Sequence, residues 1–379
     1  MAFVKSRRFV APGKDFFAFN LKYLYYTGLW PNGKWSPPKQ IFYGIYGTML
    51  TIFSSIFIIL ASIGTYNNRD DVTGLLTNLD KILVAYNFVI KAMIFFIKRK
   101  QIKTLIDEII DSGDKITANR IKMMSVHVVV ITMLILSIVS AFSLLAIYKN
   151  EMSIEAWMPF DPLVDKMHLI LASQILAVLF LPCACRAIAI QGVVGSIIMY
   201  LCDQLFELQI RIRTLEYYPE IDSQMRDDLN EIIKKHVRLI RLSKSLKAIF
   251  KEYFLIQNLA VTVELCFNAM MVTMVGFKEK KLLITFFAYL CVALLNAYIY
   301  CFLADEIIAQ SQEIALAAYD TSWTTWPVDL QRDLLIIIHV AQRPLSLSAG
   351  GMATMSIQTF GQTLYNGYSI FAVLNDVVD

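Results

Sequence analysis

The stretch PLSLSAGGMATMSIQTFGQTLYNGYSIFAVLN, residues 344–375, contains no Asp, Glu, Lys or Arg and can therefore lie in a lipid bilayer. It is nevertheless unusually polar for a helix that faces lipid. One stripe, at steps of three or four residues along a helix, is formed by Gln358, Gln362, Asn366, Ser369, Val373 and Asp376. Amide side chains in hydrocarbon need partners or water, so this stripe predicts a helix that faces other helices or a water-filled space.

Two interpretations of the stripe are open from the sequence. It can be a polar seam that holds a helix bundle together, or it can be the wall of a pore. In the second case Val373 is the apolar step near the exit, and a ring of valines in a polar tunnel can close a pore by excluding water.

The composition predicts a polytopic membrane protein. The chain has 379 residues, of which 57% are hydrophobic, and its mean hydropathy is +0.54. A soluble core cannot hide that excess. The N-terminus, MAFVKSRRFVAPGKDF, is interrupted by charges, so we expect no cleaved signal. The six cysteines fall in or beside apolar segments, so we expect no disulfide. Only four histidines are present, so we expect no metal site. We also expect no cofactor and no nucleic-acid partner.

Apolar runs long enough to cross a bilayer predict an all-α membrane protein with seven transmembrane helices. These runs lie at about residues 41–65, 77–97, 122–148, 167–202, 252–277, 282–304 and 345–375. The connections between them differ sharply in Lys and Arg. One side carries 26 of these residues, in 1–40, 97–122, 203–251 and 305–344, whereas the other side carries 6. The imbalance predicts a cytoplasmic N-terminus and an extracellular C-terminus.

Two of the long cytoplasmic connections have helical periodicity. The 203–251 connection continues the fourth span and leads into the fifth, with a break at Pro219. The 305–344 connection prolongs the sixth span and then forms an amphipathic helix between Pro327 and Pro344. Such anchor helices must bury their apolar faces, either within one chain or against another subunit. The sequence thus divides into 1–202, 203–251, 252–304, 305–344 and 345–379.

Some charged residues fall deep inside the predicted spans. Lys91 and Glu264 lie deep in the bundle, where isolated charges are costly and need partners. They can pair with each other or find separate partners, because the sequence fixes no distance between helices. Arg186 is expected to reach the cytoplasmic interface by extending its side chain.

The C-terminal third resembles the insect odorant receptor family. The resemblance is carried by YCFLADEIIAQSQEIALAAYDTSW, by QRP and by AGGMATMSIQTFGQTLYNGYSIFAVL, and the segment AWMPFDP resembles the second outer loop of that family. The matching positions are Tyr300, Cys301, Glu306, Ser311, Tyr319, Trp323, Pro344, Gly350, Ser356, Phe360, Leu364, Tyr368, Ser369, Phe371, Trp157, Pro159 and Phe160.

The resemblance implies an odorant-gated, nonselective cation channel in the plasma membrane of olfactory neurons. In this family four subunits each contribute the last helix to a central pore, and a ligand-specific subunit works with a common coreceptor. The compact 203–251 connection is like that of the ligand-specific subunit. The resemblance assigns subunit assembly to Tyr319 and Trp323. It places the gate valine of the family on Val373, the residue that the stripe also selects. The predicted pore and gate residues are therefore Gln362, Asn366, Ser369, Val373, Asp376 and Val377. At Asp376 this chain departs from the coreceptor, which has a neutral glutamine at the pore mouth.

The family also implies a pocket for a small volatile ligand in the outer half of the bundle. This pocket is enclosed by the second, third, fourth and fifth spans. Helical spacing within those halves selects Leu83, Tyr86, Asn87, Ile90, Ser140, Ser143, Ile147, Leu171, Ile175, Phe267, Met270 and Met271. Each of these faces also fits ordinary helix packing. Tyr86 and Asn87 stand out because each brings a polar group to a buried face.

Two other functions are alternatives. A metabotropic seven-helix receptor would have the opposite orientation and a DRY-like or NPxxY-like motif, which the third and seventh spans lack. A secondary transporter would favour internal repeats with paired broken helices, which are not visible. A membrane enzyme would need a cluster of nucleophiles, carboxylates or metal ligands. The sequence shows no such cluster, so we do not expect enzymatic activity.

Overall fold

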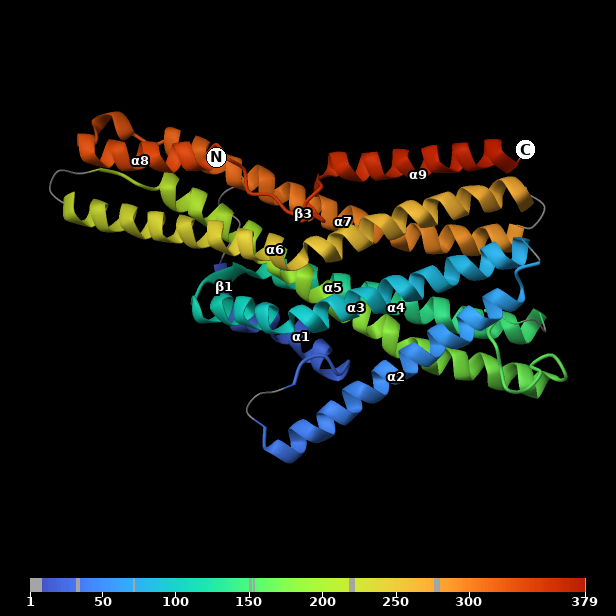
Figure 1. Cartoon of the computed structure of the whole chain (residues 1–379). Helices are drawn as coiled ribbons and strands as arrows, with labels where there is room; N and C mark the ends of the chain where they lie inside the picture. The colour runs from blue at the N-terminus through green and yellow to red at the C-terminus, as the bar shows by residue number, and fades with distance from the viewer. Residues whose placement is uncertain are drawn as a thin grey trace.

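The computed structural model describes residues 9–31, 35–70, 72–149, 152, 154–217, 222–275 and 280–378. Over these residues the chain is an elongated bundle of long helices with two short two-stranded sheets (Figure 1). The helices are α1 Gly13–Tyr26, α2 Pro37–Asn67, α3 Val72–Asp111, α4 Ala118–Lys149, α5 Lys166–Arg213, α6 Asp222–Val275, α7 Lys280–Tyr319, α8 Val328–Ala341 and α9 Ile357–Val378. A 3-10 turn, η3, covers Trp323–Thr325. One antiparallel pair joins β1 Phe9–Pro12 to the distant β2 Lys115–Thr117, and a hairpin pairs β3 Ser348–Ala349 with β4 Ala353–Thr354.

The predicted spans fall on α2 to α7 and on α9. Among the described residues, four helices are long and apolar enough by themselves to cross a membrane, namely α2, α5 and stretches of α6 and α7. Several helices are much longer than a bilayer requires. The 54 residues of α6 extend about 80 Å, against about 30 Å for the hydrocarbon core. The long helices therefore continue beyond the membrane, as the sequence predicts for the 203–251 and 305–344 connections.

The amphipathic helix predicted between Pro327 and Pro344 is α8, which begins directly after Pro327. In Figure 1, α8 and the C-terminal end of α9 lie at opposite ends of the bundle. The break predicted at Pro219 lies outside the described residues, although α5 ends before it at Arg213 and α6 begins after it.

The predicted start of the last span, at residue 345, is wrong. Residues 345–356 contain the β3–β4 hairpin, and the helix begins only at Ile357. Gly350 and Gly351 have φ of 62° and 79°, a left-handed conformation that glycine adopts readily and that turns the chain sharply. The amide of Gly350 donates to the carbonyl of Lys251 at 2.7 Å. A Cβ on Gly350 would lie 2.9 Å from Leu255, so the hairpin sits directly against α6.

The centre of the bundle is α5, which packs against α1, α2, α3, α4, α6 and α7. Nearly every side chain of α5 between Cys183 and Leu205 is buried, as expected for a helix that is apolar on all sides. Gly192 allows the closest approach, because a Cβ there would lie 2.8 Å from Asn20 and 2.9 Å from Val128. The helices around α5 are thereby held in fixed positions relative to one another.

A buried ionic network joins the helices at the end of the bundle that lies beside β2. The fully buried carboxylate of Asp203 accepts hydrogen bonds of 2.8 Å from the amide and the hydroxyl of Thr117. The guanidinium of Arg120 lies 3.8 Å from Asp203 and also pairs with Glu306. These contacts connect β2 and α4 to α5 and α7.

Asp114, in the turn before β2, extends this network to α6. Burial alone would raise the pKa of the Asp114 carboxyl, but Lys235, a hydrogen bond from Tyr200 and the guanidinium of Arg238 outweigh burial and hold that pKa below its usual range. The turn between α3 and α4 is therefore fixed to both α5 and α6.

Arg186 does not extend to the cytoplasmic interface, contrary to the prediction. It is 6% exposed and donates hydrogen bonds to the carbonyls of Thr27 and Gly47 at 3.0 and 2.7 Å and to the hydroxyl of Thr51 at 2.8 Å. The helix geometry brings these acceptors within its reach, so the guanidinium is satisfied inside the protein. Arg186 thus joins α5 to α2 and to the turn after α1.

Candidate ligand cavity and pore helix

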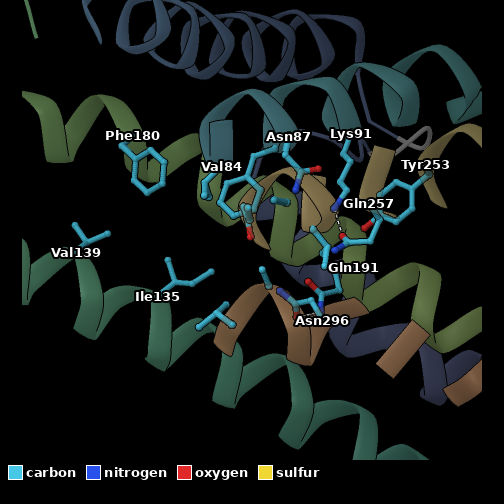
Figure 2. A pocket seen from close by; sticks show the side chains of 16 residues that line it. Val84, Asn87, Lys91, Ile135, Val139, Phe180, Gln191, Tyr253, Gln257 and Asn296 are labelled. Atoms are coloured by element: carbon cyan, nitrogen blue, oxygen red, sulfur yellow. Dashed lines mark hydrogen bonds between the residues drawn. The ribbon is translucent and has the colours of Figure 1, made fainter. Parts of the chain in front are cut away.

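A cavity of about 70 Å³ lies between α3, α4, α5, α6 and α7 (Figure 2). One water molecule needs on the order of 10–15 Å³ by the same measure, so the cavity holds several waters or a compact organic molecule. Its lining residues are Val84, Asn87, Phe88, Lys91, Ile135, Val139, Phe180, Ala187, Gln191, Tyr253, Gln257, Val261, Glu264, Val292, Ala293 and Asn296.

The residues that line the cavity lie on single faces of the helices around it. On α3 the lining positions 84, 87, 88 and 91 share one helical face, and on α6 positions 253, 257, 261 and 264 do the same. These two helices pack against each other. The cavity is therefore the space between facing sides of neighbouring helices.

One part of the cavity wall is aromatic and aliphatic. The ring of Phe180 stacks on Phe88 with centroids 6.3 Å apart and also contacts Phe57 of α2 at 5.1 Å. Valine and isoleucine side chains from α3, α4, α6 and α7 complete this surface. Such a surface favours the apolar body of a small ligand.

The other part of the wall is polar, as Figure 2 shows. The amino group of Lys91 donates to the side-chain oxygen of Gln257 and lies 5.1 Å from the centre of the Tyr253 ring. The amide of Gln191 donates to the amide oxygen of Asn296 at 2.7 Å. Most of these polar groups therefore have partners within the protein.

Among the described residues, two buried acceptors in the wall have no hydrogen-bond partner. They are the amide oxygen of Asn87 and one carboxyl oxygen of Glu264, residues that are 8% and 4% exposed. The sequence leaves open an ion pair between Lys91 and Glu264 or separate partners. In the described structure Lys91 bonds to Gln257, and it attracts Glu264 through space without a direct ion pair.

The structure places the predicted ligand residues of α3 on different faces. Asn87 lines the cavity, whereas Leu83 and Ile90 are half-buried outside this lining. Tyr86 is 38% exposed, and its hydroxyl shares a 2.8 Å hydrogen bond with the hydroxyl of Ser62 on α2.

The predicted ligand residues on the other helices also lie apart from this cavity. Leu171 and Ser140 are exposed, and Ile175 packs on the cluster that contains Phe57. Phe267, Met270 and Met271 pack with Leu76 in a separate cluster. Ser143 and Ile147 belong to α4, but their side chains lie outside the described part of the chain.

Sequence reasoning missed most of the lining residues, among them Phe180, Tyr253 and Gln257. The available signal was the pair of buried charges, Lys91 and Glu264, since both of them line the cavity. Residues on the same helical faces as these charges could have been selected. The assignment of helices that share the cavity needed tertiary distances.

The polar stripe of α9 lies on the side of the helix away from the rest of the chain. α9 packs on α6 and α7 through a face that includes the buried Thr363 and Gly367. A Cβ on Gly367 would lie 2.8 Å from Leu265. On the other side, Gln358, Gln362, Asn366 and Val373 are exposed, and Ser369 is half-exposed.

Within the stripe, the side-chain amide of Gln362 donates to that of Asn366 at 2.9 Å. The stripe therefore does not attach α9 to its own chain over the described residues. Asp376 and Val377 fall within α9, but their side chains lie outside what the structure describes.

The residues assigned to assembly lie where α7 ends. Tyr319 is its last residue and is 65% exposed, and Trp323 is half-buried in η3. Their ring centroids lie 6.3 Å apart. Together they form an exposed aromatic surface next to α8.

The fold and the cavity define a polytopic α-helical membrane protein with a small internal cavity. Its fold matches the insect olfactory receptor OR5 from Machilis hrabei, with a TM-score of 0.81 over 96% of this chain and 98% of that chain, at 16% identity. The same receptor in complex with eugenol gives a TM-score of 0.79 at 17% identity. This likeness confirms the seven-helix all-α membrane fold.

The chain belongs to the 7tm Odorant receptor family, whose sequence profile matches residues 71–368. Odorant receptor 30a of Drosophila melanogaster is 27% identical over 170 residues, which cover 45% of this chain and 44% of that receptor. Odorant receptor 49a of the same species is 30% identical over 162 residues, which cover 42% and 40%. In these alignments the chain spans less than half the length of the curated relatives. The family consists of receptors and not enzymes.

Proposed function

We propose that this chain is the odorant-binding subunit of a heteromeric ligand-gated cation channel. A small volatile molecule binds in the cavity enclosed by helices α3 to α7 and thereby opens the channel. The observation that supports this most directly is the cavity itself. It is small, lined mainly by aromatic and aliphatic side chains, and carries a few polar groups on one side. The structure of a family member with eugenol supports the assignment of a volatile ligand.

The proposed pore is lined by α9. Its exposed polar stripe lies opposite the face that packs on α6, and is thus available to the last helices of other subunits. In a tetramer the exposed Val373 of each such helix would form a narrow apolar ring. Asp376 would place a carboxylate near the mouth, where it would raise the local concentration of cations.

The proposed partner is the family coreceptor, in a heterotetramer in the plasma membrane of olfactory neurons. The exposed aromatic surface of Tyr319 and Trp323 is the proposed contact with that partner. The N-terminus would be cytoplasmic and the C-terminus extracellular. The distribution of Lys and Arg supports this orientation.

Current recordings with a panel of volatiles, with and without the coreceptor, test this function. We expect inward cation currents within a second of ligand addition, without added nucleotide, and only when both subunits are expressed. Currents that require GTP would support a metabotropic receptor, and robust currents from this chain alone would contradict its role as a ligand-specific subunit.

The variant Ala187→Phe tests the cavity. Ala187 is 6% exposed and lines it from α5, so a phenyl ring there would occupy the space of the ligand. We expect loss of the response to every active volatile. Val178→Phe adds a ring on an exposed face of the same helix and should leave responses unchanged. Unaltered responses in Ala187→Phe at normal surface expression would move the ligand site elsewhere.

A further inference from the structure

We propose that this cavity selects ligands with a hydroxyl group, that is, small alcohols and phenols, over ethers, ketones and amines of the same carbon skeleton. This inference rests on the proposed function, because it specifies the chemistry of the ligand in the same cavity. The observation that carries it is the pair of unpartnered acceptors on α3 and α6.

The unpaired acceptors face the cavity from two helices that pack together. The amide oxygen of Asn87 and one carboxyl oxygen of Glu264 belong to cavity-lining side chains that are more than nine-tenths buried. A buried acceptor without a partner costs free energy, which a ligand that brings a donor recovers. In the empty cavity, water can fill this role only as long as no ligand displaces it.

A further unpaired group lies on the same side of α3, outside the lining of the cavity. Asp80 is 1% exposed, has no hydrogen-bond partner for either carboxyl oxygen among the described residues, and lies two turns before Asn87. The acceptors that a ligand in the cavity can reach are therefore those of Asn87 and Glu264, and such acceptors favour a donor in the ligand.

A hydrogen-bond donor lies in the same wall as these acceptors. The amino group of Lys91 donates one hydrogen bond to Gln257 and, protonated or neutral, keeps at least one further N–H donor. A ligand atom that accepts from Lys91 and donates to Asn87 or Glu264 would satisfy both sides. A hydroxyl group is the smallest group that donates and accepts at once.

The other common volatile classes fit this wall less well. Ethers, ketones and esters only accept, so they would leave the acceptors of Asn87 and Glu264 buried and unpaired. A protonated amine can donate to these acceptors, but it cannot accept from Lys91, and its charge would lie beside the amino group of that residue. A hydrocarbon would satisfy none of the polar groups.

The test uses the chain coexpressed with the coreceptor and series that share a skeleton. One series is cyclohexanol, methoxycyclohexane, cyclohexanone and cyclohexylamine, a second is phenol and anisole, and a third is the linear alcohols of four to eight carbons with their methyl ethers. We expect each active hydroxyl compound to give half-maximal current at a concentration about tenfold lower than its matched ether. The matched amine should also require a higher concentration than the hydroxyl compound.

Variants identify the groups responsible. Asn87→Leu and Glu264→Leu should each reduce the ratio between ether and alcohol concentrations severalfold, because each removes an unpaired acceptor. Glu231→Leu makes the same chemical change on an exposed part of α6 and should leave the ratio unchanged. Surface labelling of each variant shows whether it has folded and reached the membrane.

The outcomes separate this inference from the proposed function. If Ala187→Phe abolishes responses but matched alcohols and ethers act equally, or ethers or amines act better, the cavity is the ligand site and its hydroxyl selectivity is wrong. Absence of any response to all three hydroxyl series also contradicts the inference. If alcohols activate the channel equally well in Ala187→Phe, both proposals fail.

Discussion

The guanidinium of Arg186 holds α2 and the end of α1 against α5, and its replacement by methionine should weaken that junction measurably. Arg186→Met keeps an unbranched side chain that can fill much of the same volume but removes all of the donors. The three hydrogen bonds lost have lengths of 3.0, 2.8 and 2.7 Å. Two of them end on backbone carbonyls, those of Thr27 and Gly47.

The magnitude follows from what each acceptor retains. A hydrogen bond to a charged group contributes about 1.5–3 kcal/mol. The carbonyl of Gly47 still accepts from the hydroxyl of Thr51 at 3.0 Å, so it keeps a partner. The charge itself no longer has to be desolvated, which offsets part of the loss. We therefore expect a net destabilisation of about 2–3 kcal/mol, most of it from the unpaired carbonyl of Thr27.

The assay is the thermal stability of the purified complex with the coreceptor, together with the fraction of chain at the cell surface. Arg186→Met should melt several degrees lower than the wild-type complex. Thr51→Val, which removes a single partner of the guanidinium, should have a smaller effect of about 1 kcal/mol. A melting temperature equal to that of the wild type in Arg186→Met, or an equal loss in Thr51→Val, would refute this account of the junction.

Three further predictions concern the pore, the subunit interface and the turn before α4. Cysteines at Gln362 and Asn366 should react with water-soluble thiol reagents in the open channel faster than a cysteine at Leu364; equal rates would make the stripe a seam between subunits. Tyr319→Ala should reduce co-purification with the coreceptor severalfold, and unchanged recovery would place the interface elsewhere. Asp114→Asn should lower the stability of the complex at pH 7, and its deficit relative to wild type should shrink as the pH falls below about 4, because the pKa of this carboxyl is lower in the folded chain than in the unfolded chain and its stabilisation is lost on protonation. A deficit that does not change with pH would contradict the ionic role of Asp114.

The helices could be predicted from the sequence because lipid leaves the backbone little choice. A segment inside a bilayer must satisfy its own amide and carbonyl groups, so an apolar run of sufficient length becomes a helix. The amphipathic α8 was predicted from its helical spacing instead, and the runs that became α2 to α7 followed this rule. The β3–β4 hairpin did not, because residues 345–356 lack charge and yet two glycines turn the chain against α6.

The polar character of the cavity could also be predicted in part. Lys91 and Glu264 were identifiable as groups that need partners, because a charge within a span is costly wherever the span lies. Their partners were not identifiable. Gln257 is 166 residues from Lys91 along the chain, and only the packing of α3 against α6 brings the two together.

Tyr86 and Asn87 show where the limit lies. They are adjacent in sequence and both carry polar groups, so helical spacing selects both equally well. The structure turns Asn87 into the cavity and Tyr86 toward Ser62 on α2. One residue corresponds to about 100° around a helix, and the rotation of α3 about its axis is fixed by long-range packing on α2, α5 and α6. The sequence by itself thus determined which segments cross the membrane and which side chains are chemically able to form a site, whereas the tertiary structure alone decided which of those side chains face the same space.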